Sequence, residues 1–347
     1  MLEHGGNLND AVIRYGIARA DWLDLSTGIN PDFYPAPVLR ADAWHRLPES
    51  SNELVAAACA CYGAPQMLPV AGTQAAIQAL PQLRMREHGV ARVVVAAPAY
   101  AEHAHRWQQA GHAMREVGYA GLSDVIDAVD AVDACDVMVV CNPNNPTGAR
   151  VAPDVLLGWA QRLAARGGWL VVDEAFGDTT PHMSVAAYTG AQAGLIVLRS
   201  VGKFFGLAGV RLGFVAAQEH ILNGLRELLG PWSVSGPAQQ IGIAALRDVD
   251  WQQSTRARLL AAGQRLQRLL AKYGIDSGGS AMYQWWPEPH AVAFHDRMAR
   301  EGIWVRLFMH GAGGIRLGLP PDEAGWQRLQ QALQAWREFT EQTEHPA

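Results

Sequence analysis

Apolar runs of strand length alternate with segments of helical length over residues 66–217, and this alternation constrains the fold more than any other feature. Runs such as CDVMVVC (135–141) and LIVL (195–198) have the length of buried strands. When strands alternate with helices, the strands form a parallel sheet that helices cover on both faces. We therefore expect an α/β fold with a mostly parallel sheet.

The pattern changes after Pro231, where the alternation gives way to long helices. Helices are expected over Gly236–Leu246 and Asp250–Tyr273, and strand-like runs follow near the C-terminus. Residues 1–30 show no clear period and are expected to form an irregular arm. The sequence therefore predicts an arm over residues 1–30, a large α/β domain over 31–230 and a smaller α+β domain over 231–347.

Charge and composition argue against two classes of partner. The net charge is −5 and no basic run is present, so neither nucleic acid nor an anionic membrane is an expected partner. The sequence has no run of eighteen apolar residues, and MLEHGGNLND does not resemble a secretory leader. We expect a soluble, cytoplasmic protein.

The spacing of cysteine and histidine does not indicate a metal site. The four cysteines are too few and too irregular for a disulfide framework or a zinc site. Cys59 and Cys61 lie two apart in a helical run, and we expect them to be buried thiols. His103 and His105 are also two apart and cannot share one helix face, so we expect both at the surface.

The stretch 195–214 places Lys203 among apolar residues. Apolar surroundings disfavour the ammonium form of lysine and leave the amine available for a Schiff base with an aldehyde cofactor. An equally open alternative is that the stem of Lys203 lies along apolar surface while its ammonium reaches water. A P-loop and a nucleophile elbow around Ser200 are excluded, because Val197 and Leu198 stand where those motifs need glycine.

Other polar residues stand where predicted strands end. Gly72-Thr73-Gln74 begins a helix after a short strand, and the N–H groups of such a turn can bind an anion, although most such turns bind nothing. The segment NPNNPTG (142–148) predicts a rigid loop after a strand. Asp173 ends another strand, at the edge where open α/β sheets bind ligands, with helix capping as the alternative role.

The order of these motifs resembles the fold type I enzymes that use pyridoxal 5'-phosphate, in the aspartate-aminotransferase superfamily, over nearly the whole chain. The resemblance implies that Lys203 forms the Schiff base with the cofactor and that Asp173 keeps the pyridine nitrogen protonated. It implies that Tyr100 stacks on the ring and that Asn145 hydrogen-bonds the ring hydroxyl. It assigns the rest of the cofactor contacts, mainly to the phosphate, to Gly72, Thr73, Gln74, Ser200 and Arg211.

Two departures from the transaminating relatives stand out. Phe176 replaces a tyrosine that gives the ring hydroxyl a second hydrogen bond, and Leu47, in Arg46-Leu47-Pro48, replaces a tyrosine that reaches the partner subunit's cofactor phosphate. Both changes imply a site that differs electronically from that of histidinol-phosphate aminotransferase.

The segments HGGN (4–7) and LDLSTGINP (23–31) resemble the start of the threonine-phosphate decarboxylases, a family of cobalamin-pathway lyases. This resemblance implies decarboxylation of L-threonine O-3-phosphate to (R)-1-amino-2-propanol O-2-phosphate. It also implies a homodimer whose active sites lie at the subunit boundary, with the N-terminal arm contributing. It assigns this phosphorylated amino acid to His4, Gly28, Asn145, Arg306 and Arg316, with Arg316 holding the carboxylate.

Two other functions stay open. One is an aminotransferase that acts on a phosphorylated substrate such as histidinol phosphate. The other is a non-catalytic binding or regulatory role, which is disfavoured because Lys203, Asp173 and Arg211 are all present.

Overall fold

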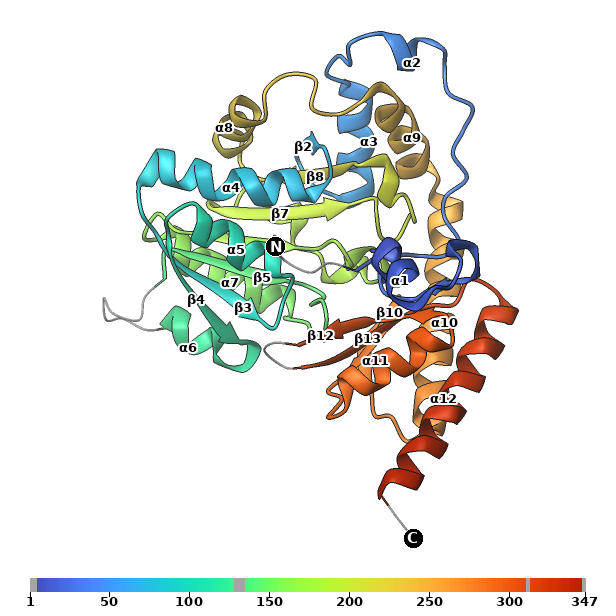
Figure 1. Ribbon diagram of the computed structural model, residues 1–347. Coiled ribbons are helices and arrows are strands. Elements are labelled where there is room, and N and C mark those ends of the chain that lie inside the picture. Colours follow the sequence, from blue (N-terminus) through green and yellow to red (C-terminus); the bar gives the residue numbers. More distant parts are fainter. Residues whose placement is uncertain (1–4, 128–134, 310–312, 345–347) are drawn as a thin grey trace. The chain divides into compact units, whose positions relative to one another are not determined.

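The computed structural model describes residues 5–127, 135–309 and 313–344 (Figure 1). The chain divides into two compact units. The large unit comprises the described residues within Phe33–Asn145 and Ala149–Thr255. The small unit comprises those within Met1–Asp32, Pro146–Gly148 and Arg256–Ala347.

A seven-stranded sheet in the order β2-β8-β7-β6-β5-β3-β4 forms the centre of the large unit. β8 runs antiparallel to its two neighbours, and the other neighbouring strands are parallel. The predicted mostly parallel sheet is therefore confirmed. The strands span β2 (Met67–Val70), β3 (Arg92–Ala97), β4 (Ala113–Gly118), β5 (Val137–Cys141), β6 (Trp169–Asp173), β7 (Leu195–Ser200) and β8 (Gly213–Ala216).

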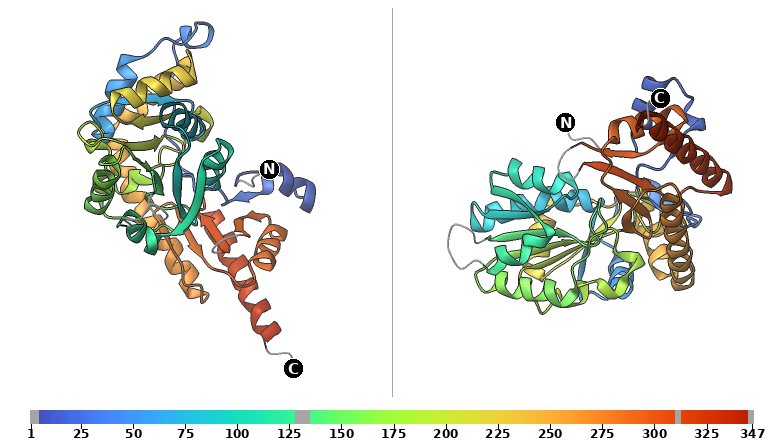
Figure 2. Two further views of the ribbon diagram at one scale, coloured as in Figure 1. Left: turned by 90° about the vertical axis from the view of Figure 1, so that its left-hand side faces the viewer. Right: turned by 90° about the horizontal axis from the view of Figure 1, so that it is seen from below.

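Helices cover both faces of this sheet (Figure 2). The helices of the large unit are α2 (Asp42–His45), α3 (Asn52–Tyr62), α4 (Thr73–His88), α5 (Ala101–Gln109), α6 (Leu122–Asp127), α7 (Pro153–Ala164), α8 (Glu219–Leu229) and α9 (Gly236–Arg247). On one face, α4, α5 and α8 pack on alternate strand residues such as Val95, Val139 and Val171. α7 packs on β6. Burial on both faces explains why the central strands read as continuous apolar runs.

The direction of the strands gathers several loops at one edge of the sheet. β3, β5, β6 and β7 are parallel. β8 is antiparallel to both β7 and β2, so β2 points in the same direction as these four strands. The segments that follow these five strands therefore start from the same edge. They include the start of α4, Tyr100, the Asn142 loop, Asp173 and Ser200.

The small unit contains two sheets. β1 (Leu23–Asp24) pairs in parallel with β11 (Ile303–Trp304), and an antiparallel sheet has the order β12 (Arg306–Phe308), β13 (Gly314–Gly318), β10 (Tyr283–Trp286) and β9 (Gly278–Ser280). Its helices include α11 (Ala291–Arg300) and α12 (Glu323–Glu344), while α10 (Val249–Lys272) begins in the large unit and continues into the small one.

The expectation of an irregular arm over residues 1–30 is wrong. Helix α1 (Leu8–Tyr15) and strand β1 lie within this range. The helix forms because its apolar residues, Leu8 and Val12 among them, pack on a cluster built around Trp22 and Trp304.

Across the described ranges, every helix is too short or too polar to cross a membrane.

Candidate active site

Arg211 packs against Gly72, the glycine of the turn between β2 and α4. A Cβ on Gly72 would lie 2.5 Å from Nη2 of Arg211, so the guanidinium packs directly on the Gly72 backbone. Gly72 has φ 75° and ψ 157°, a conformation that in practice only glycine adopts, and no side chain in the described chain caps the α4 N-terminus. The first N–H groups of a helix have no partner within the helix. This corner therefore combines a guanidinium with a helix N-terminus, which suits a phosphate group.

The end of β7 lies at the same corner. Ser200 pairs in register with Gly213, and a Cβ on Gly213 would lie 2.7 Å from the backbone nitrogen of Thr73. Ser200 Oγ accepts a hydrogen bond of 3.1 Å from the Gly202 N–H. Arg211 has a φ of 57°, which non-glycine residues rarely adopt and which is common at ligand sites. The turn conformation thus directs Arg211 toward Gly72.

Asp173, at the carboxyl end of β6, has both carboxylate oxygens held. Oδ1 accepts the Ala175 N–H at 2.9 Å, and Oδ2 lies 2.9 Å from Nε2 of His103. Cys141 stands beside Asp173 in register on β5, and its sulfur, a His103 nitrogen and an Asp173 oxygen all lie within 4.8 Å of one another. The carboxylate is thereby fixed in direction and kept close to hydrogen-bond donors.

The expectation that His103 lies at the surface is wrong. Its side chain is 2% exposed, whereas His105 is exposed as expected. Two residues that lie two apart on a helix cannot share one face, but one of them can still lie on the buried face. Since His103 stands four residues before the buried Trp107, helical periodicity places it on the buried face of α5 and could have found it. Burial lowers the pKa of His103, but the neighbouring Cys141 and Asp173 outweigh this and raise the pKa to about 10.

Tyr100 is the N-cap residue of α5 and bonds back to α4. Its hydroxyl donates to Oε1 of Gln74 at 3.2 Å, and Nε2 of Gln74 donates to Oε2 of Glu102 at 2.6 Å. The Tyr100 ring meets the His103 ring edge-on, with 6.1 Å between centroids. Burial, together with the charges of Glu102 and Asp173, raises the pKa of Tyr100 to about 12, which keeps the phenol neutral.

Lys203 lies in a turn after β7 and is half-buried. Its Nζ is 5.3 Å from the centroid of the Phe176 ring, and the next two residues, Phe204 and Phe205, are fully buried. Since Phe176 stands three residues after Asp173, this contact places the Lys203 amine beside the segment that follows β6.

The loop after β5 is held by its asparagines. Asn142 donates to the Val151 carbonyl at 3.1 Å and accepts its N–H at 2.9 Å, and Asn144 donates to the Pro98 carbonyl at 2.8 Å. This fixed loop carries Asn145 at the same sheet edge as Asp173.

The small unit brings Gly28, Arg306 and Arg316 together. Arg306 and Arg316 are register partners on β12 and β13, and Arg316 Nη2 donates to the Ser26 carbonyl. Burial lowers the pKa of Arg316 to about 10, and the neighbouring charge of Arg306 acts in the same direction. Like charges opposite each other on paired strands repel, and a bound anion would relieve this repulsion. His4, the other residue assigned to the substrate, lies outside the described residues.

The expectation that Cys59 and Cys61 are buried is wrong, because both thiols are half-buried on α3. Cys135 and Cys141 are buried.

Several of the expected cofactor residues of the large unit thus lie near one another. Arg211 lies against Gly72, two residues before Gln74, and Gln74 bonds Tyr100. Tyr100 reaches Asp173 through His103, and Lys203 lies beside Phe176. The set fits pyridoxal phosphate, because it combines a phosphate corner, a buried carboxylate, an aromatic ring and an amine.

A family model described as "Aminotransferase class I and II" matches residues 21–328, and the chain belongs to this family. A solved structure, that of histidinol-phosphate aminotransferase from Sinorhizobium meliloti in complex with pyridoxal-5'-phosphate, has a TM-score of 0.81 at 20% identity and covers 98% of this chain and 96% of its own. The expected fold type I architecture is therefore confirmed.

Within this family, two curated relatives narrow the class. Threonine-phosphate decarboxylase of Pseudomonas aeruginosa is 54% identical over 97% of this chain and 99% of its own length. The protein of the same name from a Sinorhizobium species is 42% identical over 96% of this chain and 97% of its own length. The chain accordingly stands among the threonine-phosphate decarboxylases, a group of pyridoxal-phosphate-dependent lyases, and that expectation is confirmed.

Proposed function

We propose that this chain decarboxylates L-threonine O-3-phosphate to (R)-1-amino-2-propanol O-2-phosphate and serves cobalamin biosynthesis. The observation that carries the proposal is the 54% identity to a threonine-phosphate decarboxylase over almost the full length of both chains. The paired guanidinium groups of Arg306 and Arg316 support it, because the substrate carries both a phosphate and a carboxylate.

When bound, the cofactor supplies a protonated ring that accepts the electron pair of the breaking Cα–carboxylate bond. Asp173 would hold the proton on the ring nitrogen, and the hydrogen bonds from Ala175 and His103 fix its carboxylate in place. Lys203 would hold the cofactor through its amine and would return a proton to Cα once carbon dioxide has left. Tyr100 packs on the ring, and Asn145 hydrogen-bonds the ring hydroxyl.

The remaining large-unit residues hold the cofactor phosphate. Arg211 would bind the phosphate with its guanidinium and Ser200 with its hydroxyl. The Gly72-Thr73-Gln74 turn would bind it with the N–H groups of its backbone. Phe176 leaves the ring hydroxyl without the second donor that a tyrosine would give, so the electronic balance of the ring differs from that in transaminating relatives.

The resemblance to the threonine-phosphate decarboxylases suggests the substrate contacts. Arg306 and His4 would bind the substrate phosphate and Arg316 its carboxylate, and Gly28 and Asn145 are the other proposed contacts. A decarboxylase must hold the carboxylate bond perpendicular to the cofactor ring, so a dianionic phosphate gripped by a guanidinium gives the substrate a fixed orientation from which this can be achieved.

One experiment separates decarboxylation from the transaminase alternative. Cofactor-loaded protein is given L-threonine O-3-phosphate, and the product is identified by mass spectrometry together with released carbon dioxide. A parallel reaction contains histidinol phosphate and 2-oxoglutarate. Formation of aminopropanol phosphate supports the proposal. Glutamate formation in the parallel reaction, with no carbon dioxide in the first, would overturn it in favour of an aminotransferase.

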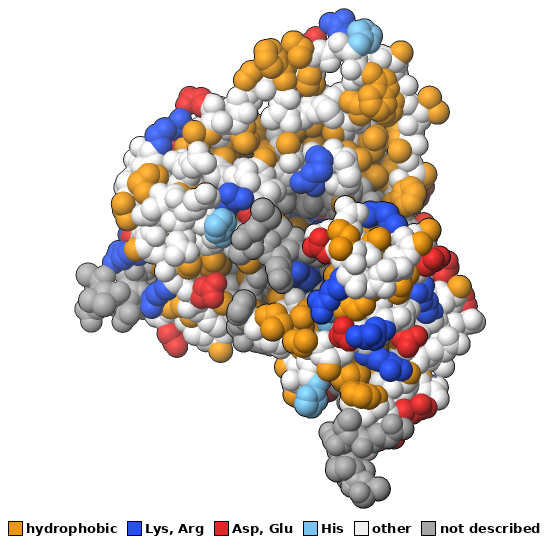
Figure 3. Space-filling view, viewed as in Figure 1, with side chains coloured by type: hydrophobic (Ala, Val, Ile, Leu, Met, Phe, Trp, Pro, Cys, Tyr) orange, Lys and Arg blue, Asp and Glu red, His pale blue; other side chains and the backbone are white. Residues whose placement is uncertain are grey.

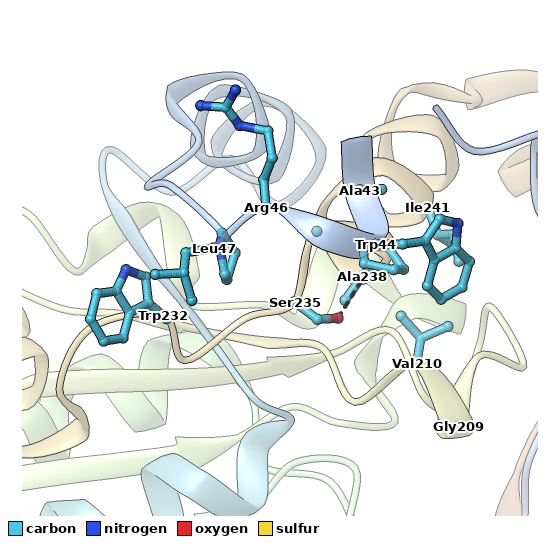
Figure 4. A pocket seen from close by; sticks show the side chains of 13 residues that line it. Ala43, Trp44, Arg46, Leu47, Gly209, Val210, Trp232, Ser235, Ala238 and Ile241 are labelled. Atoms are coloured by element: carbon cyan, nitrogen blue, oxygen red, sulfur yellow. Dashed lines mark hydrogen bonds between the residues drawn. The ribbon is translucent and has the colours of Figure 1, made fainter. Parts of the chain in front are cut away.

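We also propose that the chain forms a homodimer. A groove of about 550 Å³ in the large unit is lined largely by apolar residues, and Figure 4 shows Leu47 beside Trp232 on one side and Trp44 near Val210 and Ile241 on the other. Trp44 is 71% exposed, Leu47 64% and Trp232 59%. Hydrophobic side chains gather over this region, formed by α2 and α9, in Figure 3. Exposed apolar clusters of this kind mark protein interfaces.

A further inference from the structure

Glu102, in the first turn of α5, is a buried carboxylate that hydrogen-bonds Gln74, one of the expected cofactor residues. The residue is 5% exposed. Its Oε2 accepts two hydrogen bonds, one of 2.8 Å from Nε of Arg106 and one of 2.6 Å from Nε2 of Gln74. Arg106 stands one turn later on the same helix, so the buried charge is compensated locally.

The carboxylate of Glu102 fixes which way the Gln74 amide faces. An ionised carboxylate can only accept hydrogen bonds, so Gln74 must present its NH₂ group to Glu102. Its carbonyl oxygen, Oε1, then faces the Tyr100 hydroxyl 3.2 Å away. A reversed amide would set two oxygens against each other at Glu102 and would offer Tyr100 a donor instead of an acceptor. The Glu102 carboxylate therefore determines, through the orientation of the Gln74 amide, that Tyr100 faces a hydrogen-bond acceptor.

The consequence falls on the hydroxyl and ring of Tyr100. Because Gln74 offers only an acceptor, the Tyr100 hydroxyl must donate toward α4, and its proton is not available to other groups. The ring is held at two places, at its hydroxyl by Gln74 and at its edge by His103. The high pKa of this phenol, raised mainly by burial, keeps the donor protonated at neutral pH.

We propose that Glu102 is a positioning residue that acts through Gln74 to set the hydroxyl direction and ring plane of Tyr100. The inference rests on the proposed role of Tyr100 as the residue that packs on the cofactor ring, but it does not depend on which substrate the enzyme uses. In this proposal the Gln74 side chain links Glu102 to Tyr100, while its backbone lies in the first turn of α4.

The test is a double-mutant cycle between Glu102 and the Tyr100 hydroxyl. The variants are E102Q, E102A, Y100F and the two double variants with Y100F. The readouts are the dissociation constant of the cofactor from equilibrium dialysis and the visible circular dichroism of bound cofactor, which reports how the ring is held. Loss of one such hydrogen-bond chain should weaken cofactor binding about three- to tenfold. E219Q is the matched control, because Glu219 also lies in the first turn of a helix and pairs with an arginine, but is exposed.

We expect E102A and Y100F each to weaken binding and reduce the dichroism, and the double variant to be no worse than Y100F alone. E102Q should show a smaller effect, because a neutral amide can still accept from Gln74 but no longer fixes its direction. E219Q should match the wild type. Additive losses in the double variant would overturn the inference, since Glu102 would then act independently of the Tyr100 hydroxyl. Unchanged binding and dichroism in folded E102Q and E102A would overturn it as well.

A further variant, Y100A, keeps this test separate from the proposed role of Tyr100. If Y100A binds cofactor as the wild type does, the stacking role of Tyr100 is wrong. If Y100A binds poorly while the cycle is additive, only the assignment of Glu102 is wrong.

Discussion

The imidazole Nε2 of His103 lies 2.9 Å from Oδ2 of Asp173, and both side chains are buried. Because an ionised carboxylate only accepts, the proton lies on Nε2 and is donated to Asp173. With a His103 pKa raised to about 10, the pair is intact at neutral pH and is lost as the pH rises through that value. The imidazolium of His103 thus compensates the charge of the buried Asp173 carboxylate.

Replacing His103 should weaken cofactor binding in a way that depends on pH. In H103F the Asp173 carboxylate keeps the Ala175 N–H but loses the imidazolium, so it should hold the cofactor ring nitrogen less firmly. We expect roughly tenfold weaker binding than in the wild type below pH 10, and a smaller difference above it, where His103 has itself lost its charge. Equilibrium dialysis of the cofactor over a pH series measures this.

Two further variants make the His103 prediction specific. H103Q places an amide N–H near the position of Nε2 and should recover part of the affinity. H105F changes the exposed histidine of the same helix and should behave as the wild type. A loss in H103F that is the same at every pH would contradict the role given to the imidazolium charge.

Substituting Gly72 should destroy the phosphate corner without unfolding the protein. In G72A the new Cβ would lie 2.5 Å from Nη2 of Arg211, and φ 75° with ψ 157° is strained for alanine. The strain costs about 1–3 kcal/mol and the guanidinium must move away. Cofactor affinity should fall at least tenfold, roughly the loss of one charged contact. G158A is the control: nothing lies within 4 Å of that Cβ, on helix α7, and it should bind cofactor normally.

Most of the site in the large unit can be predicted from the sequence, because the apolar strands that define the fold also mark where the site residues stand. Gly72, Asp173 and Lys203 each follow an apolar strand, and parallel strands bring such positions to one edge. The two-residue spacing of His103 and His105 does not reveal that His103 is buried, whereas its four-residue spacing from the buried Trp107 does. The opposition of Arg306 and Arg316 depends on how β12 and β13 pair, and the register of two strands is not encoded in either strand alone.

Breaking the buried ion cluster behind the site should destabilise the whole protein. Arg199 Nη1 lies 2.7 Å from Glu174 Oε2, its Nη2 lies 2.9 Å from Asp178 Oδ1, and all three side chains are buried. R199M leaves two buried carboxylates without their cation. We expect a loss of about 3–5 kcal/mol in the free energy of unfolding, measured with urea. R226M removes an exposed pair with Glu219 and should cost at most about 1 kcal/mol. Equal losses in both variants would contradict the view that burial decides the effect.

Removing one of the paired arginines should weaken substrate binding more than turnover. R306Q takes away a charged contact to the substrate phosphate, so KM for L-threonine O-3-phosphate should rise about tenfold or more. R300Q changes an exposed arginine of α11 that pairs with Asp296, and its KM should not change. In the wild type, affinity for the anionic substrate should fall as the pH rises through about 10, where Arg316 loses its proton. An R306Q enzyme with normal KM would exclude the phosphate contact.

A charge placed in the groove at Leu47 should separate the proposed dimer. Leu47 lines the groove and is 64% exposed, so a side chain buried between two copies would become an unpaired buried charge in L47E. Sedimentation velocity should show the wild type as a dimer and L47E as a monomer at the same concentration. V90E provides the comparison, because Val90 lies in the same unit, is 67% exposed and does not line the groove. V90E should stay dimeric. If L47E stays dimeric as well, the copies do not meet at this groove, since no interface core accepts an unpaired carboxylate without loss of affinity.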